Sequence, residues 1–257
     1  MSVIRLEGVK KKYNGTYVLQ GIDLAFEKGA IIGYIGPNGA GKSTTIKILT
    51  GIIGDFEGEV NVLGFDVRKD PVAVKQQIGY IPENAALYDV LTPSEFLSFV
   101  GKLYKLDEAQ TKKKALELLR LFELADKRDV RMNSFSKGMK QKVLLISGLI
   151  HNPEIIFLDE PLSGLDANAV ILVKEILSQL KTAGKTIFYS SHIMDVVEKI
   201  SDRIVIINKG AVIADGTFEE LKEAGTHGSL ETIFTALTGN EKHLSTAGEF
   251  VDIMKNL

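Results

Sequence analysis

A glycine-rich segment, GPNGAGKST at residues 36–44, constrains the fold of this chain more than any other stretch. It fits the pattern G-x-x-x-x-G-K-[ST] and lies between an apolar run at residues 31–35 and a helical pattern at residues 44–52. Glycines allow successive backbone N–H groups to turn inward around a phosphate, and a helix N-terminus adds partial positive charge. The segment therefore predicts a strand, a phosphate-binding loop and a helix in immediate succession.

The same segment supplies the side chains that a bound nucleotide needs. Lys42 is placed to reach the β- and γ-phosphates, and the Ser43 hydroxyl is placed to bind Mg²⁺. The alternative, a plain strand–helix turn, needs neither the lysine nor so many glycines. We expect nucleotide contacts from Gly36, Pro37, Asn38, Gly39, Ala40, Gly41, Lys42, Ser43 and Thr44. The loop predicts nucleotide binding, but it does not distinguish a kinase, a GTPase, a helicase or a transport motor.

Two adjacent carboxylates follow the apolar run IIFLD at residues 155–159. In an open α/β sheet, ligands bind at the carboxyl ends of the strands. At such an end Asp159 can hold Mg²⁺, directly or through water, and Glu160 can orient and activate a water molecule against the γ-phosphate. The alternative for Asp159 is a cap on the following turn. The pair of carboxylates favours hydrolysis over simple nucleotide storage.

Strand and helix patterns alternate over most of the chain, which is typical of an α/β fold with a mostly parallel sheet. The strand candidates are residues 3–9, 18–26, 31–36, 78–81, 155–159, 186–190 and 203–208. Residues from about 85 to 150 carry only helical patterns, so we expect an inserted helical subdomain there. After about residue 216, the amphipathic stretches FEELKEA, LETIFTAL and GEFVDIMKNL predict a helical tail. The lysine runs at 10–12 and 112–114 are interpreted as solvated faces.

Composition excludes several classes of protein and site. The net charge of −2 provides no basic field for nucleic acid, so we expect no nucleic-acid partner. The chain has no cysteine, hence no disulfide framework and no thiolate metal site. Its purely apolar stretches fall short of the roughly 20 residues that a membrane span needs. The first residues, MSVIRLEGVKKKY, lack the apolar core of a secretory signal, and we expect a cytoplasmic location.

The stretch SFSKGMKQKV at residues 134–143 decides between the nucleotide-binding classes. Taken alone, it is a solvated helix start with Ser136 as the cap residue. Its place in the chain, after a phosphate loop and a helical insert and before FLDEPLSGLD and SSH, resembles the motif order of the ABC-type ATPases. Ser136 and Gly138 match that family's signature, commonly LSGGQ, whereas Phe135, Lys137 and Met139 depart from it.

The resemblance covers residues 1 to about 225 and implies a P-loop NTPase core of the RecA-like kind. It implies an N-terminal antiparallel β-subdomain and an inserted helical subdomain at about 85–150, and it leaves residues 226–257 as the C-terminal helical tail. In this family two units face head to tail, and the signature of one closes over the γ-phosphate held by the other. The resemblance therefore implies that Ser136 and Gly138 contact the nucleotide of a second subunit.

Other positions receive roles from the resemblance. Asp166 matches the loop that crosses the dimer interface, although Asp166 or Asn168 is alternatively a cap of the next helix. His192 matches the switch histidine that contacts the γ-phosphate. Tyr13 matches the aromatic residue that stacks on adenine, with an ordinary packed tyrosine as the alternative. Glu83 stands where the family usually has glutamine; it can accept from Mg²⁺-bound water but cannot donate, and we interpret it as a sensor beside the metal.

The sequence thus predicts an ATP-binding and ATP-hydrolysing subunit of an ABC transporter, with ATP and Mg²⁺ as cofactors. Its expected partners are an integral membrane permease and a second ATP-binding subunit, either identical or a paralogue, on the cytoplasmic face of the membrane. The SKGM signature and Glu83 favour export over import. The alternatives are a non-transport ABC ATPase acting on nucleic acid or the ribosome, a regulatory module without turnover, and a small-molecule kinase.

Overall fold

The computed structural model describes residues 2–83, 87–224, 228–239, 250 and 253–254, and two sheets organise this part of the chain. The smaller sheet is antiparallel, in the order β2-β1-β4-β5. Its strands are β1 (Ser2–Tyr13), β2 (Thr16–Glu27), β4 (Glu57–Val62) and β5 (Phe65–Asp66). This sheet is the expected N-terminal antiparallel subdomain.

The larger sheet has the order β10-β9-β3-β8-β7-β6, and only β10 is antiparallel to its neighbour among the described strands. Its strands are β3 (Ile31–Ile35), β6 (Ile78–Ile81), β7 (Ile155–Asp159), β8 (Thr186–Ser190), β9 (Arg203–Asn208) and β10 (Ala211–Gly216). Every residue of β3, β7 and β8 is buried, as expected for parallel strands covered on both faces. The predicted α/β class with a mostly parallel sheet is confirmed.

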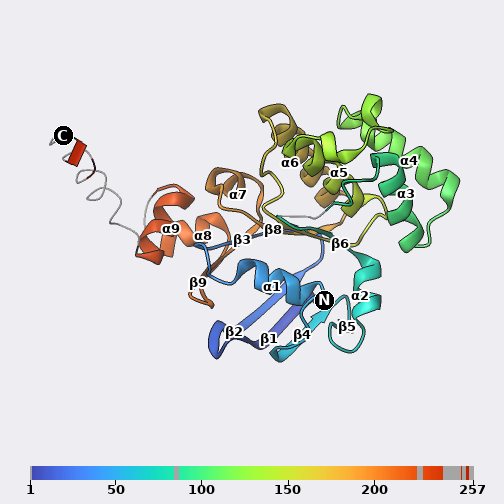
Figure 1. Ribbon diagram of the computed structural model, residues 1–257. Coiled ribbons are helices and arrows are strands. Elements are labelled where there is room, and N and C mark those ends of the chain that lie inside the picture. The colour runs from blue at the N-terminus through green and yellow to red at the C-terminus, as the bar shows by residue number, and fades with distance from the viewer. Residues whose placement is uncertain (1, 84–86, 225–227, 240–249, 251–252, 255–257) are drawn as a thin grey trace.

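Side chains of the central strands alternate between two cores. Ile31 and Ile35 of β3 belong to one cluster, whereas Ile32 and Tyr34 belong to the other, because successive side chains of a strand point to opposite faces. The first cluster is covered by the helical elements of the chain's middle and end, and the second by α1 (Lys42–Leu49) and the smaller sheet. Figure 1 shows α1 between the two sheets. The helix that follows the phosphate loop thus packs between the two sheets.

Helices form the rest of the described chain. Figure 1 shows α3, α4 and α5 grouped together on one side of the molecule, which fits the expected helical insert. The remaining helices are α2 (Pro71–Gln77), α3 (Pro93–Leu103), α4 (Glu108–Leu121), α5 (Lys137–Leu149), α6 (Ala167–Thr182), α7 (Met194–Ile200), α8 (Phe218–Ala224) and α9 (Leu230–Thr238), with short 3-10 turns at Ala125–Lys127 and Met132–Ser134. Two of the expected tail helices are α8 and α9, and the third, at GEFVDIMKNL, lies mostly outside the described residues.

The interpretation of the lysine runs as solvated faces was wrong at two positions. Residues 10–12 belong to β1, so their side chains alternate, and Lys11 is turned inward with only 8% of its side chain exposed. Its ammonium pairs with Asp55 at 2.9 Å. In the second run, the Lys114 ammonium donates to the Ile150 carbonyl at 2.7 Å. A charged run is therefore not uniformly solvated when an element's period directs one member inward.

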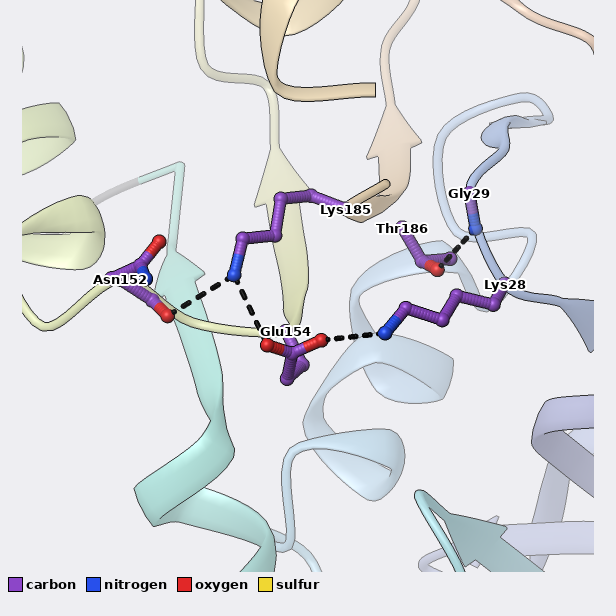
Figure 2. Close-up of polar contacts among 6 residues, drawn as sticks. All are labelled: Lys28, Gly29, Asn152, Glu154, Lys185 and Thr186. Atoms are coloured by element: carbon purple, nitrogen blue, oxygen red, sulfur yellow. Dashed lines mark hydrogen bonds and ion pairs between the residues drawn. The ribbon is translucent and has the colours of Figure 1, made fainter. Parts of the chain in front are cut away.

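A polar cluster joins the smaller sheet to the amino ends of β7 and β8. In Figure 2 the Glu154 carboxylate lies between two ammonium groups, accepting from Lys28 at 3.0 Å and from Lys185 at 3.1 Å. These bonds, that from Lys28 above all, lower the pKa of Glu154. The Gly29 amide donates to the Thr186 hydroxyl at 3.0 Å beside them. This end of the sheet is closed by internal pairs, whereas the opposite end carries the pocket described next.

Candidate nucleotide site

A pocket of about 510 Å³ lies where the chain leaves the carboxyl ends of β3 and β7. Parallel strands bring these ends to one edge of the sheet, so segments far apart in sequence meet there. The lining residues are Val18, Asn38, Gly39, Gly41, Lys42, Ser43, Thr44, Glu83, Asp159, Glu160 and His192. All of them except Val18 are residues for which the sequence predicted a role at a nucleotide.

Glycines of the phosphate loop are required by its backbone and its packing. Gly41 has a φ of 111°, a backbone conformation that residues with a side chain rarely adopt. A Cβ there would also lie 2.5 Å from Leu19 Cδ2. A Cβ on Gly36 would lie 2.3 Å from the Ile207 carbonyl oxygen. Together with Pro37 and Ala40, Gly36 does not line the pocket but shapes the loop, in which the Ala40 amide donates to the Pro37 carbonyl at 3.1 Å.

Lys42 is the first residue of α1, and its ammonium is held inside the loop. It donates to the Gly36 carbonyl at 2.6 Å and to the Pro37 carbonyl at 3.2 Å. Burial lowers the pKa of Lys42, and the nearby carboxylates of Glu160, Asp159 and Glu83 oppose that shift. The ammonium is therefore preorganised next to the pocket, where phosphate oxygens offer a stronger acceptor than neutral carbonyls.

The Asp159 carboxyl is buried at the end of β7, with the residue only 3% exposed. Burial raises the pKa of Asp159, the Ser43 hydroxyl opposes the shift, and the negative charges of Glu160 and Glu83 add to it. Three carboxylates thus face one ammonium, a charge excess that a divalent cation would neutralise. The described residues contain no group of three His, Cys, Asp or Glu side chains that could hold a metal on their own. Mg²⁺ suits such a site, because it usually takes one or two protein ligands together with phosphate oxygens.

Glu160 has an unusual backbone conformation and a well-defined side chain. Its φ of 51° is in the left-handed region, and its amide donates to the Ser190 carbonyl at 3.0 Å. One carboxylate oxygen lies 2.8 Å from His192 Nδ1 and accepts from the Ser191 hydroxyl at 3.4 Å. The Glu160 side chain is 12% exposed and the His192 side chain is 69% exposed. The carboxylate is fixed, whereas the imidazole is open to a ligand.

The signature and interface residues lie apart from the pocket. Ser136 begins α5, and its hydroxyl accepts from the Met139 amide at 3.2 Å. Asp166 begins α6 and accepts from the Ala169 amide at 2.9 Å. Both helix-cap alternatives are therefore observed, with Asp166 rather than Asn168 as the cap of α6. Neither residue lines the pocket, and neither does Gly138.

Tyr13 is also outside the lining of the pocket. It ends β1 with 46% of the residue exposed, and the Lys11 ammonium lies 5.0 Å from its ring centroid. Val18, on β2, lines the pocket without having been predicted to do so. Its alternating strand pattern carries no sign of a site; only the packing of β2 against the phosphate loop brings it there.

Comparisons with known proteins agree with this geometry. The family model described as ABC transporter matches residues 19–163. A linearmycin resistance ATP-binding protein of Bacillus subtilis, LnrL, is 38% identical over 219 residues, covering 85% of this chain and 70% of LnrL. A solved ATP-binding subunit of an ABC transporter superposes with a TM-score of 0.86 at 32% identity, covering 92% of this chain and 99% of that one.

A second solved structure has a TM-score of 0.78 at 26% identity and covers 83% of this chain and 98% of the other. It is a dimeric ATP-binding cassette in a post-hydrolysis state, bound to ADP and Pi. In the part of the present chain that is described, no helix has both the length and the apolar character required to cross a bilayer.

Proposed function

The chain belongs to the ABC transporter family, and from that premise we propose that its ATPase activity powers export through a separate membrane permease. It is an ATP-binding and ATP-hydrolysing subunit of this family. The observation that carries the ATPase part of this proposal is the convergence of the phosphate loop, three carboxylates and His192 on one pocket. The resistance function in the name of LnrL supports export as the direction, as does the SKGM signature.

Hydrolysis in this proposal is performed by residues that the pocket brings together. The Lys42 ammonium exchanges its carbonyl acceptors for β- and γ-phosphate oxygens, and the loop amides around Gly39 and Gly41 wrap the phosphates. Glu160 accepts a proton from the attacking water, because its carboxylate is fixed at the pocket wall. His192, bonded to Glu160 through Nδ1, keeps Nε2 for the γ-phosphate.

A bound Mg²⁺ would supply positive charge that offsets the negative charge of the phosphates. Ser43 and Asp159 are its proposed holders, supported by the burial of Asp159 and by its contact with the Ser43 hydroxyl. Glu83 reaches the same pocket and accepts from the water shell of the metal in our proposal. Glu83 also precedes the helical subdomain in the chain, which suits a residue that couples the metal site to that subdomain.

A second ATP-binding subunit completes the site in this proposal. Ser136, Gly138 and Asp166 lie outside the pocket of their own chain, which supports a role at the nucleotide of a partner. The similar cassette that is dimeric and holds ADP and Pi supports the same arrangement. Tyr13 is proposed to stack on adenine from the exposed end of β1, with Val18 beside the nucleotide.

The helical subdomain is the proposed contact for the permease. Several large apolar side chains of this region are exposed, among them Tyr88, Val90, Phe99 and Leu103. A cytoplasmic location on the inner face of the membrane follows if that permease is the partner. In our proposal, residues 1–225 form the nucleotide-binding domain and residues 226–257 form a tail. The net charge of −2 supports the absence of a nucleic-acid partner. The relatives named above, which are ATP-binding proteins of ABC transporters, do not support the non-transport alternative.

Isolation of this chain from solubilised membranes tests the proposal. We expect a polytopic membrane protein to co-purify in stoichiometric amount, and phosphate release by the complex to depend on Mg²⁺. A Glu160→Gln chain is the matched control, since it keeps the shape of the pocket but removes the proposed base. Recovery only from the soluble fraction, with ribosomes or nucleic acid attached, would contradict the transport role and leave the ATPase assignment standing.

A further inference from the structure

The backbone of Glu160 is doubly disfavoured. Its φ of 51° lies in the left-handed region, and it precedes Pro161, a position that normally favours extended backbone. A conformation of this kind persists only when the surrounding structure holds it. The contacts that keep the turn at residues 160–163 in place therefore also keep the Glu160 carboxylate directed into the pocket.

Hydrogen bonds hold this turn from three sides. The Glu160 amide donates to the Ser190 carbonyl at 3.0 Å, and the Ser163 amide closes the turn on the Glu160 carbonyl at 3.2 Å. The third bond comes from another helix: the side-chain amide of Gln141 donates to the Pro161 carbonyl at 3.0 Å. Gln141 is only 5% exposed, so its bond is made away from water, where losing it is costly.

Gln141 lies on α5, the helix that Ser136 begins. The first turn of α5 packs on the same segment: the Lys137 ammonium donates to the Ser163 hydroxyl at 2.8 Å. A Cβ on Gly138 would lie 2.6 Å from the Gly164 carbonyl oxygen, so the two backbones are in close contact. The N-terminal half of α5 and the turn after β7 are therefore packed directly against each other.

We propose that Gln141 is a positioning residue for hydrolysis, which holds the Pro161 carbonyl and through it the strained Glu160. When Ser136 at the start of α5 contacts a phosphate, a shift of the helix changes the position of the Pro161 carbonyl through this hydrogen bond. The position of the Glu160 carboxylate changes with it. The inference rests on the proposed function, because it assigns Gln141 a role only if Glu160 acts in ATP hydrolysis. Lys137, which departs from the family signature, belongs to the same contact between α5 and the turn, because its ammonium bonds the Ser163 hydroxyl.

The direct test compares Gln141→Met with Ser147→Ala in the purified full chain. Methionine keeps the length and burial of the side chain but has no donor for Pro161. Ser147 is a matched control, since it is also buried on α5 and its hydroxyl bonds the Leu144 carbonyl at 2.7 Å, away from the turn. We expect kcat for ATP hydrolysis to fall about 10- to 100-fold in Gln141→Met, with KM and the ATP dissociation constant within twofold of wild type. Ser147→Ala should keep the wild-type kcat.

Hydrogen exchange supplies a readout that does not depend on activity. Without nucleotide, the Ser163 amide of Gln141→Met should exchange faster than in wild type, because the turn loses one of its restraints. The same amide should be unchanged in Ser147→Ala. Equal exchange in Gln141→Met and wild type would overturn the proposal, as would a wild-type kcat in Gln141→Met or an equal loss of kcat in both variants.

A second variant keeps the proposal falsifiable if Gln141→Met does not fold. Gln141→Glu has nearly the same shape but can donate to Pro161 only when its carboxyl is protonated. Its kcat relative to wild type should therefore rise as the pH is lowered, and a ratio independent of pH would overturn the proposal. A wild-type chain that hydrolyses no ATP under any of these conditions would instead contradict the proposed function, so the two failures are distinguishable.

Discussion

The first turns of helices α1 and α5 differ in what satisfies their backbone amides. At α1 the N-cap residue is Gly41, and no side chain caps the helix. At α5 the Ser136 hydroxyl accepts from the Met139 amide at 3.2 Å. An uncapped helix start leaves its first N–H groups available to bind an anion. In a capped start, a side-chain hydroxyl already accepts a hydrogen bond from one of these N–H groups. The α1 pocket is therefore formed within one chain, whereas the α5 start contacts a phosphate, in our proposal, only when a second subunit brings its nucleotide there.

The largest effect is expected when the proposed base is removed from the α1 pocket. Glu160→Gln should lower kcat for ATP hydrolysis by about 10²- to 10⁴-fold, because the amide cannot take the proton from water. ATP binding should be retained, since Lys42 and the loop are untouched. Phosphate release and equilibrium binding of ATP, measured on the same preparation, check both parts. A loss of binding equal to the loss of hydrolysis would contradict the role given to Glu160.

The next largest effect is expected at the capped helix. Ser136→Ala should lower hydrolysis about 10- to 100-fold, the value of one hydrogen bond to a charged group, while leaving ATP binding by the isolated chain unchanged. Its loss of stability should be only about 1 kcal/mol, as for a lost cap.

Ser229→Ala is the matched control for Ser136→Ala, because Ser229 caps α9 in the same way through the Thr232 amide. We expect a similar change in melting temperature and full ATPase activity in this control. If Ser136→Ala hydrolysed ATP as fast as Ser229→Ala, Ser136 would be a cap and nothing more.

A smaller effect, on stability, is expected at the contact between α5 and the turn after β7. Gly138→Ala places a Cβ 2.6 Å from the Gly164 carbonyl oxygen, so the backbones must separate, at a cost of about 1–3 kcal/mol. Gly54→Ala is a suitable control, since a Cβ at Gly54 meets no atom within 4 Å. Urea unfolding of both variants measures the difference. Equal stabilities would show that the packing of Gly138 is not the reason for glycine there.

The smallest effect concerns the charge of Asp159. Burial raises the pKa of Asp159 in the folded chain, so folding favours its protonated form, and the ionised carboxylate weakens stability once the pH exceeds the ordinary aspartate pKa. Asp159→Asn should therefore raise the melting temperature of the nucleotide-free chain at neutral pH, and the gain should vanish at low pH. A gain that grew as the pH fell would contradict the burial argument.

How far the sequence predicts this molecule depends on whether a feature is local. The loop at 36–44 and the pair Asp159 and Glu160 were predictable, because strand, loop and helix patterns place such residues at a sheet edge without knowledge of the partner elements. Val18 and Gln141 were not predicted, since each becomes important only through packing against a segment distant in sequence. Lys11 was misinterpreted because a run of like charges hid the alternation of the strand beneath it.

In the proposed arrangement, a complete site needs the α1 pocket of one chain and the α5 start of another. Mixing two inactive variants tests it most directly: Lys42→Ala disables the pocket, and Ser136→Asp keeps a good helix cap but opposes the phosphate with a negative charge. Each mixed pair would hold one intact site, built from the Lys42 of one chain and the Ser136 of the other.

We predict that phosphate release by the mixture exceeds the sum of the two variants measured separately. A mixture that hydrolyses no more ATP than that sum would contradict the shared site.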